Sequence, residues 1–410
     1  MKRVSNSGRK VVITGLGIIS SIGIGKADFW TSLIAGKSGI SPIEAFDTSA
    51  YERHFGGEVK NFRAEEFIDK RKLKHMGRAS QLALAAARLA LDDAGLNIKK
   101  SDKEKAGVCV GTTMGEAQIL EKMDKLWVDK GEKLVDYKTV ILFPTYSIVA
   151  NLANELQLKA NSFMFANACS AGNYSIGYAF DLIRSNKADI MLAGGVDAFS
   201  RVNLVGFSRL YAMAPEVCRP FDLNREGMLV GEGAGVLLLE TLDSALKRKA
   251  TIYAEVLGYG LSCDAYHMTA PKEEGIVECM KRAIKETDIK IEDVDYISAH
   301  GTGTVQNDKT ECSAIKKVFG SRYKEIPVSS IKSMLGHTMG AAAAIEAIAC
   351  CLTIKEGEIA PTINYQTPDP ECDIDCVPNE ARKKEVKIAL NNSYAFGGNN
   401  ASLVLRKLEK

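Results

Sequence analysis

Residues 163–184 most constrain the fold, because they join a strand to a helix through a glycine-containing turn. Phe163–Ala166 is apolar and predicts a short buried strand. Gly172 and its small neighbours permit a tight turn, and the apolar or small residues from Tyr174 onward predict a buried helix. Cys169 therefore lies where a strand ends and a helix begins.

The position of Cys169 permits two interpretations. Free N–H groups and the positive end of the helix dipole favour an anion, and helix N-termini lower the pKa of a cysteine from its ordinary value of about 8.5. The thiolate is the nucleophilic form, so Cys169 is a candidate catalytic nucleophile. A free cysteine is also often only a small buried apolar residue. The choice depends on the residues that accompany it.

A faint internal repeat places two histidines in the same context. A strand ending in Gly-Thr-Thr precedes the unit that carries Cys169, and a strand ending at His300 precedes a similar strand–turn–helix unit that carries His337. A chain of 410 residues also exceeds the usual size of a single core. We therefore predict an α/β protein of two similar halves, 1–255 and 256–410, whose helix N-termini converge.

The bulk composition excludes several classes of function. A formal net charge of +2 gives no reason to expect nucleic acid or membrane binding. The 10 cysteines are scattered without paired metal-ligand spacing, which predicts reduced thiols in a cytoplasmic protein and no metal site. No apolar run reaches transmembrane length. The glycine clusters match neither a dinucleotide-binding nor a phosphate-binding loop.

A cysteine and two histidines on glycine-rich turns suit carbon–carbon bond formation on thioesters. The cysteine takes an acyl group from a carrier thioester. Two neutral imidazoles then donate hydrogen bonds to the enolate oxygen that forms when a malonyl unit loses carbon dioxide. The carbanion attacks the acyl-cysteine, and N–H groups of Cys169 and of the 394–400 loop are candidate donors to the tetrahedral oxyanion.

Six motifs together carry a resemblance to a known family over nearly the whole chain. They are Asn167-Ala-Cys-Ser-Ala-Gly172, Arg219-Pro-Phe-Asp222, Gly231-Glu-Gly-Ala-Gly235, Ala299-His-Gly-Thr-Gly-Thr304, Ile331-Lys-Ser-Met-Leu-Gly-His-Thr338 and Asn392-Ser-Tyr-Ala-Phe-Gly-Gly-Asn399. The chain resembles the β-ketoacyl-[acyl carrier protein] synthases, most closely the type II condensing enzymes of fatty acid synthesis. The resemblance implies a thiolase-like fold, five-layered αβαβα with two pseudo-duplicated halves.

The resemblance also implies partners and residue roles. We expect a homodimer that takes acyl and malonyl groups from acyl carrier protein and needs no cofactor, since the substrates carry phosphopantetheine. Cys169 corresponds to the nucleophile, and His300 and His337 to the decarboxylation and condensation histidines. Lys332 corresponds to the lysine beside the site, for which Glu311 and Glu346 are the supporting acids.

Further positions follow from the same motifs. Thr302 and Thr304 match the threonines that contact pantetheine. Phe396 matches the gating phenylalanine, whose N–H is the second oxyanion donor. Met114 lies where the family lines the acyl pocket, and Asn400 is a further candidate for substrate binding.

The basic run Lys70, Arg71, Lys72 and Lys74 has two interpretations. It is either a solvated helix face or a docking surface that attracts the acidic carrier protein by complementary charge.

Four alternative functions can be compared with the sequence: a thiolase, an initiating synthase, a silent chain-length subunit and a synthase of a specialised pathway. A thiolase would need a second cysteine near the C-terminal glycine loop, and residues 391–400 contain none. An initiating synthase would have asparagine in place of His337. A catalytically silent chain-length subunit of a heterodimer usually lacks the cysteine. Unusual residues around Cys169 and the Tyr394-Ala395 pair leave a specialised lipid or polyene pathway as an alternative to fatty acid elongation.

Overall fold

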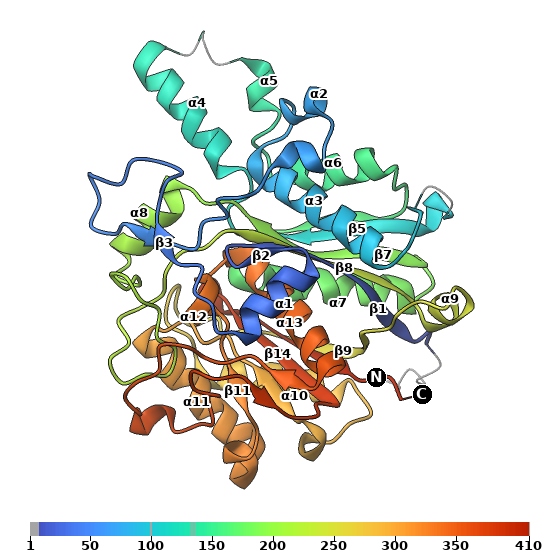
Figure 1. Ribbon diagram of the computed structural model, residues 1–410, viewed down its shortest axis with the longest axis vertical. Coiled ribbons are helices and arrows are strands. Elements are labelled where there is room, and N and C mark those ends of the chain that lie inside the picture. The colour runs from blue at the N-terminus through green and yellow to red at the C-terminus, as the bar shows by residue number, and fades with distance from the viewer. Residues whose placement is uncertain (1–7, 99–100, 132, 134–135, 410) are drawn as a thin grey trace.

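The computed structural model describes residues 8–98, 101–131, 133 and 136–409, and its centre is one large mixed β-sheet (Figure 1). The sheet runs in the order β11-β10-β14-β15-β9-β1-β8-β7-β5-β6, with the short β2 paired to β1. Its ten main strands are β1 Val11–Ser20, β5 Ala106–Gly111, β6 Ser162–Phe165, β7 Ile190–Asp197, β8 Gly233–Thr241, β9 Ala254–Cys263, β10 Tyr296–Ser298, β11 Val328–Ser329, β14 Ile388–Tyr394 and β15 Asn399–Arg406.

The strand order repeats once along the chain. In the first half, β5 pairs in parallel with β6 and β7, and β8 runs antiparallel between β7 and β1. In the second half, β10 pairs in parallel with β11 and β14, and β15 runs antiparallel between β14 and β9. The two copies join where β1 pairs with β9 through residues 11–13 and 254–256. The faint repeat in the sequence is therefore a repeat of topology.

Six long helices build the α layers around this sheet (Figure 1). Those that cover the outer face of the first half are α3 Arg78–Asp93 and α6 Tyr146–Leu156. Those that cover the outer face of the second half are α10 Glu273–Lys285 and α11 Val305–Phe319. Those that fill the space between the halves are α7 Ala171–Arg184 and α13 Ala342–Glu356. This is the predicted five-layered α/β arrangement.

The remaining elements are short or peripheral. They are β2 Gly23–Ile24, α1 Lys26–Ile34, β3 Ser41–Pro42, β4 Phe55–Gly56, α2 Lys70–Leu73, α4 Ala117–Lys130, α5 Tyr137–Val140, α8 Arg201–Arg209, α9 Leu242–Lys247, α12 Lys332–Leu335, β12 Glu358–Ile359 and β13 Arg382–Lys383. Several single 3₁₀ turns connect them, including η5 Ala168–Ser170, η8 Met339–Ala341 and η10 Phe396–Gly398. Within the described residues, no helix has the length and apolar character needed to cross a bilayer.

The central helices explain where the site lies. α13 is buried on every side from Ala342 to Ile354, because small and aliphatic residues let sheet strands and α7 pack against it. At its start a Cβ on Gly172 of α7 would lie 2.7 Å from the backbone nitrogen of Ala344. The N-terminal ends of the two helices therefore meet, as the sequence predicts.

One stretch differs from its sequence pattern. Residues 199–213 are apolar without a regular period, which predicts an irregular segment, but they contain α8, because the side chain of Ser200 accepts a hydrogen bond from the Asn203 N–H and caps the helix. In the amphipathic stretch 116–139, α4 ends at Lys130, since the next residue, Gly131, has a φ of +87°, which lies outside the helical range.

Candidate active site

Cys169 sits in a tight connection between β6 and α7. The preceding Ala168 has a φ of +49°, a left-handed conformation that non-glycine residues rarely adopt. The turn η5 then leads directly into α7 at Ala171. The hydroxyl of Ser393 in β14 donates to the Cys169 carbonyl at 2.8 Å and ties the turn to the other half. The thiol is therefore held at the seam between the halves.

His300 lies just after β10 and is held through its backbone. The N–H groups of His300 and Gly301 both donate to the carboxylate of Glu311, each at 2.8 Å. Gly301 has a φ of +40°, which a residue with a Cβ would adopt only under strain. Glu311 in α11 thus fixes the turn that presents the imidazole.

His337 lies between α12 and α13 with a defined tautomer. The Met339 N–H donates to its Nδ1 at 3.1 Å, so Nδ1 is an acceptor and the neutral ring carries its proton on Nε2. Nε2 is buried and bonds to no described residue. The ring therefore presents an N–H donor to whatever occupies the site.

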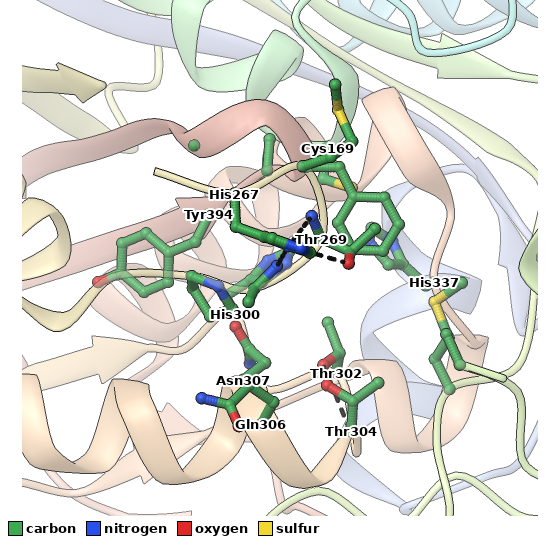
Figure 2. A pocket seen from close by; sticks show the side chains of 18 of the residues that line it. Cys169, His267, Thr269, His300, Thr302, Thr304, Gln306, Asn307, His337 and Tyr394 are labelled. Carbon is green, nitrogen blue, oxygen red and sulfur yellow. Dashed lines mark hydrogen bonds between the residues drawn. The ribbon is translucent and has the colours of Figure 1, made fainter. Parts of the chain in front are cut away.

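The structure brings Cys169, His300 and His337 into one cavity (Figure 2). One ligand atom of each, the sulfur or a ring nitrogen, lies within 4.8 Å of the other two. The two imidazoles meet edge to face with ring centroids 5.4 Å apart. A sulfur from the first half and two imidazoles from the second therefore share one reaction centre.

The three groups are electrically neutral at rest. Burial and the positive charge of Lys332 lower the pKa of both histidines well below 6.5, and for His300 the neighbouring His337 adds to this effect. Burial raises the pKa of the Cys169 thiol to about 12, although Lys332 and the N–H groups of Cys169 and Phe396 act in the opposite direction. The expectation of a helix-stabilised thiolate is thus wrong for this buried state, because desolvation outweighs the helix end.

The Cys169, His300 and His337 cluster has the residue types of a metal site but the wrong tautomer. A ligating imidazole needs a lone pair on the nitrogen that faces the metal. In His337 the lone pair on Nδ1 already accepts from Met339, so Nε2 keeps its proton. His337 therefore presents a hydrogen-bond donor, and not a ligand lone pair, to the centre of the cluster.

Lys332 lies beside the cluster and forms a buried ion pair with Glu346 of α13. Glu311 was predicted to hold the same lysine, but it binds the backbone of His300 and Gly301 instead. Lys332 still lowers the pKa of Glu311, which burial raises to about 7. One acid therefore holds the lysine and the other positions a histidine.

Phe396, Thr302 and Thr304 also line this cavity, which encloses about 560 Å³ including its open mouth. The Phe396 ring packs against Phe207 with centroids 5.8 Å apart, and the Phe396 N–H is directed at the sulfur of Cys169. The hydroxyls of Thr302 and Thr304 share a hydrogen bond of 2.9 Å. All three residues therefore lie at the reaction centre, and their roles as gate, oxyanion donor and pantetheine contacts stay predictions.

Two predicted substrate residues lie outside the cavity lining. The Met114 N–H donates to Asp197, which holds the turn after β5. The side-chain amide of Asn400 donates to Asp264 at 2.7 Å and to Ser262 at 3.2 Å. Neither residue lines this cavity, so the contacts with substrate predicted for them stay predictions.

The predicted docking residues Lys70, Arg71, Lys72 and Lys74 lie on and just after α2. Arg71 is paired with Asp69 at 2.7 Å, and Lys72 with Glu155 of α6 at 2.7 Å. Lys70 and Lys74 are exposed and form no ion pair with any described residue. Only part of the basic run is therefore available to an acidic partner.

Sequence reasoning missed three residues of the site. Asp197 at the end of β7 accepts four hydrogen bonds: from the Thr112 hydroxyl, from the N–H groups of the next two residues of that turn, and from the Gly340 N–H at 2.6 Å. His267 and Asn307 both line the cavity. The signal for Asp197 was its place at the end of a buried Gly-Gly strand, whereas a loop histidine and a helical asparagine give no local signal.

Comparison with known proteins identifies the family. The model described as "Beta-ketoacyl synthase, N-terminal domain" matches residues 8–245, and "Beta-ketoacyl synthase, C-terminal domain" matches residues 253–366. A curated 3-oxoacyl-[acyl-carrier-protein] synthase 2 of Staphylococcus aureus is 41% identical over 98% of this chain and 99% of its own. The protein of the same name from Synechocystis is 40% identical with the same coverage of both chains.

Solved structures share the architecture. The ishigamide ketosynthase/chain length factor has a TM-score of 0.96 and 46% identity, covering 98% of this chain and 100% of that chain. AntDE:AntF, a type II polyketide synthase acyl-carrier protein in complex with its ketosynthase, has a TM-score of 0.90 and 35% identity, with the same coverage. The site geometry, both family models and these relatives agree: the chain belongs to the β-ketoacyl synthase family.

Proposed function

We propose that the protein condenses an enzyme-bound acyl group with malonyl-[acyl carrier protein], releasing carbon dioxide and forming 3-oxoacyl-[acyl carrier protein] in fatty acid elongation. The observation that carries this proposal is the cluster of Cys169, His300 and His337 in one cavity. The full-length similarity to curated 3-oxoacyl-[acyl-carrier-protein] synthases supports it.

The first half-reaction loads Cys169. Its sulfur attacks the thioester carbonyl of the acyl carrier, the bond from that carbonyl to the carrier sulfur breaks, and the carrier leaves as a thiol with the proton that Cys169 loses. The N–H groups of Cys169 and Phe396 are both directed at the sulfur. From there they stabilise the oxyanion of the tetrahedral intermediate. The product is an acyl thioester on Cys169.

The second half-reaction uses the histidines as donors. The malonyl thioester loses its carboxylate as carbon dioxide, and the electron pair moves into an enolate whose oxygen accepts from the Nε2–H of His337 and from His300. The enolate carbon attacks the acyl carbonyl and displaces the Cys169 sulfur, which regains a proton from solvent. The phosphopantetheine arm of the acyl carrier protein supplies the thioester, so these steps need no cofactor bound to the enzyme.

The test is intact-mass spectrometry of the protein mixed with acyl carrier thioester. We expect one acyl group on Cys169, none in Cys169→Ala, and normal loading but about 10²- to 10³-fold slower malonyl decarboxylation in His337→Ala. Loading of Cys169→Ala would place the nucleophile elsewhere, and unchanged decarboxylation in His337→Ala would remove the proposed role of the imidazole.

Acyl carrier protein is the proposed partner, and a solved relative is described as a ketosynthase in complex with its acyl-carrier protein. Lys70 and Lys74 are the unpaired cations through which the acidic carrier would dock. In the loading assay, Lys70→Glu with Lys74→Glu should raise the KM for the carrier-bound substrate several-fold and leave a free pantetheine thioester unaffected. Lys72→Glu alone is the control, since Lys72 is engaged with Glu155.

A specialised lipid or polyene pathway is the second candidate function. The ishigamide ketosynthase/chain length factor is 46% identical to this chain, compared with 41% for the curated synthase of S. aureus. A protein of that kind would work beside a chain-length subunit, whereas an elongation enzyme is expected to be a homodimer. The two candidates therefore differ in assembly.

A further inference from the structure

Asn307 lies in the first turn of α11 and lines the reaction cavity, but none of the steps above uses it. Figure 2 shows it directly beneath His300. Only 8% of the residue is exposed. A buried side-chain amide normally satisfies both its nitrogen and its oxygen, so its partners are informative.

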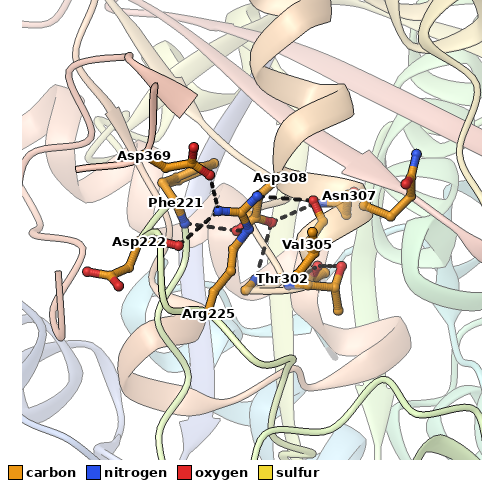
Figure 3. A network of polar contacts seen from close by, with 12 residues as sticks. Phe221, Asp222, Arg225, Thr302, Val305, Asn307, Asp308 and Asp369 are labelled. Atoms are coloured by element: carbon orange, nitrogen blue, oxygen red, sulfur yellow. Dashed lines mark hydrogen bonds and ion pairs between the residues drawn. The ribbon is translucent and has the colours of Figure 1, made fainter. Parts of the chain in front are cut away.

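The nitrogen of this amide is already engaged. Asn307 Nδ2 donates to Asp308 Oδ1 at 3.1 Å. A carboxylate only accepts hydrogen bonds, so the nitrogen must face Asp308 and the oxygen must face away from it. Asp308 itself accepts from the Phe221 N–H at 2.8 Å and the Gly303 N–H at 3.2 Å (Figure 3).

Arg225 clamps the same region from the other side. The guanidinium is buried, pairs with Asp369 at 2.5 Å and lies 3.9 Å from Asp308. It also donates to the carbonyl of Val305, the first residue of α11, at 3.2 Å (Figure 3). The start of α11 is thus fixed, and turning the Asn307 amide over would set its oxygen against a carboxylate.

The free polar atom of Asn307 is therefore its oxygen. No described residue donates to Oδ1. The hydroxyls of Thr302 and Thr304 line the same cavity, and one hydroxyl hydrogen of the pair is left to donate. An amide oxygen together with a hydroxyl donor complements a secondary amide, which offers one N–H and one C=O.

We propose that Asn307 recognises the carrier arm: its Oδ1 accepts the N–H of a secondary amide in the phosphopantetheine that delivers the thioester. Asp308 is a positioning residue that keeps the oxygen turned toward the arm. This inference rests on the proposed function, because that function is what brings phosphopantetheine into the cavity. It assigns part of substrate recognition to a side chain other than the threonines.

The test compares pantetheine thioesters in which each amide N–H is replaced in turn by an ester oxygen. One lost hydrogen bond should raise the KM of the wild-type protein about 2- to 10-fold for one analogue, with little change in kcat. In Asn307→Ala the amide and that ester should have the same KM. Gln306→Ala is the comparison: Gln306 is the neighbouring amide, exposed but also lining the cavity, and its loss should leave the discrimination intact if Asn307 is the acceptor.

Three outcomes would overturn the assignment. Equal KM values for all analogues with the wild-type protein would do so without any variant, so the proposal is testable even if Asn307→Ala does not fold. Discrimination that survives in Asn307→Ala, or disappears in Gln306→Ala, would place the acceptor elsewhere. A fall in kcat with the amide preference unchanged would mean that Asn307 acts on His300. Loading of Cys169 by the amide substrate is measured separately, so failure of the proposed function is distinguishable.

Discussion

At the scale of single residues, the reaction centre consists of neutral groups whose charge is controlled by burial. Because the pKa values of His300 and His337 are far below 6.5, both rings remain neutral as the pH falls through the range where an ordinary histidine gains a proton. We expect malonyl decarboxylation to show no midpoint near pH 6.5 and to fall only in more acidic solution. A rate profile from pH 5 to pH 8 measures this, and a midpoint near 6.5 would contradict it.

Removing the Lys332 charge tests how far that charge contributes to the low pKa values of the two histidines. Lys332→Met with Glu346→Gln deletes the buried ion pair without leaving one charge unpaired. Since Lys332 lowers both histidine pKa values and burial remains, the acidic midpoint should move toward 6.5 without reaching it. An unmoved midpoint would mean that burial alone sets it.

The identities of the reactive residues could be predicted from the sequence, but their charge states could not. The sequence places Cys169, His300 and His337 each on a glycine-rich turn after a strand. This pattern survives in the structure for Cys169 and His300, whereas the short helix α12 separates His337 from its strand. The pKa of Cys169 depends on how completely distant segments cover it, including Phe396 and Lys332. Glu311 was assigned to the wrong partner for the same reason: hydrogen bonds between a helix and a turn leave no periodicity in a sequence.

At the scale of elements, the contact between α7 and α13 sets the distance from the sulfur to the imidazoles. A Cβ on Gly172 would lie 2.7 Å from the Ala344 nitrogen and 3.2 Å from the Gly340 oxygen. We expect Gly172→Ala to destabilise the protein by about 1–3 kcal/mol through overpacking and to slow condensation by moving Cys169. Thermal unfolding and the loading assay measure the two effects.

Gly206 in α8 provides the matched control, because a Cβ there meets nothing within 4 Å. Gly206→Ala should stabilise its helix by about 1 kcal/mol and leave loading unchanged. A Gly172→Ala protein with wild-type stability and activity would show that the helices can separate at no cost.

The convergence of the two helices was predictable from strand–turn–helix units, whereas α8 was missed because its apolar residues show no clear helical period.

At the scale of the whole molecule, β6 is an edge strand of the large sheet, so the backbone groups on its outer side are available to pair with another strand. The Phe165 carbonyl accepts from the Thr112 N–H of the segment after β5, so 163 and 165 face β5 while 162 and 164 turn their backbone groups outward. Large exposed apolar side chains also occur in and just after α4 and α5, including Trp127, Tyr137 and Ile141. We propose a two-fold dimer in which the β6 strands of two copies pair.

Sedimentation of the purified protein should therefore give twice the chain mass. Met164→Pro removes an outward N–H without touching the ladder to β5, and it should shift the population toward monomer. Phe163→Pro is the contrast, since it breaks the β5 ladder and should destabilise the fold as well. A wild-type chain that sediments as a monomer would favour the second candidate function, in which a different subunit supplies the partner strand.

The duplicated architecture could be anticipated from the echo between the two halves, since each strand–turn–helix unit is local. The strand order could not, because it depends on pairings between strands more than one hundred residues apart, such as β1 with β8. Assembly is the least predictable level, because edge strands and exposed apolar side chains are recognisable only once the sheet is built.

Within the sheet, the two copies of the strand pattern pair at β1 and β9 through only a few residues, whereas the buried core around α7 and α13 joins the rest of the two halves. The sulfur comes from one half and the imidazoles from the other, so turnover requires the halves to stay packed together. A small molecule that separated α7 from α13 would therefore stop the reaction without touching the sulfur.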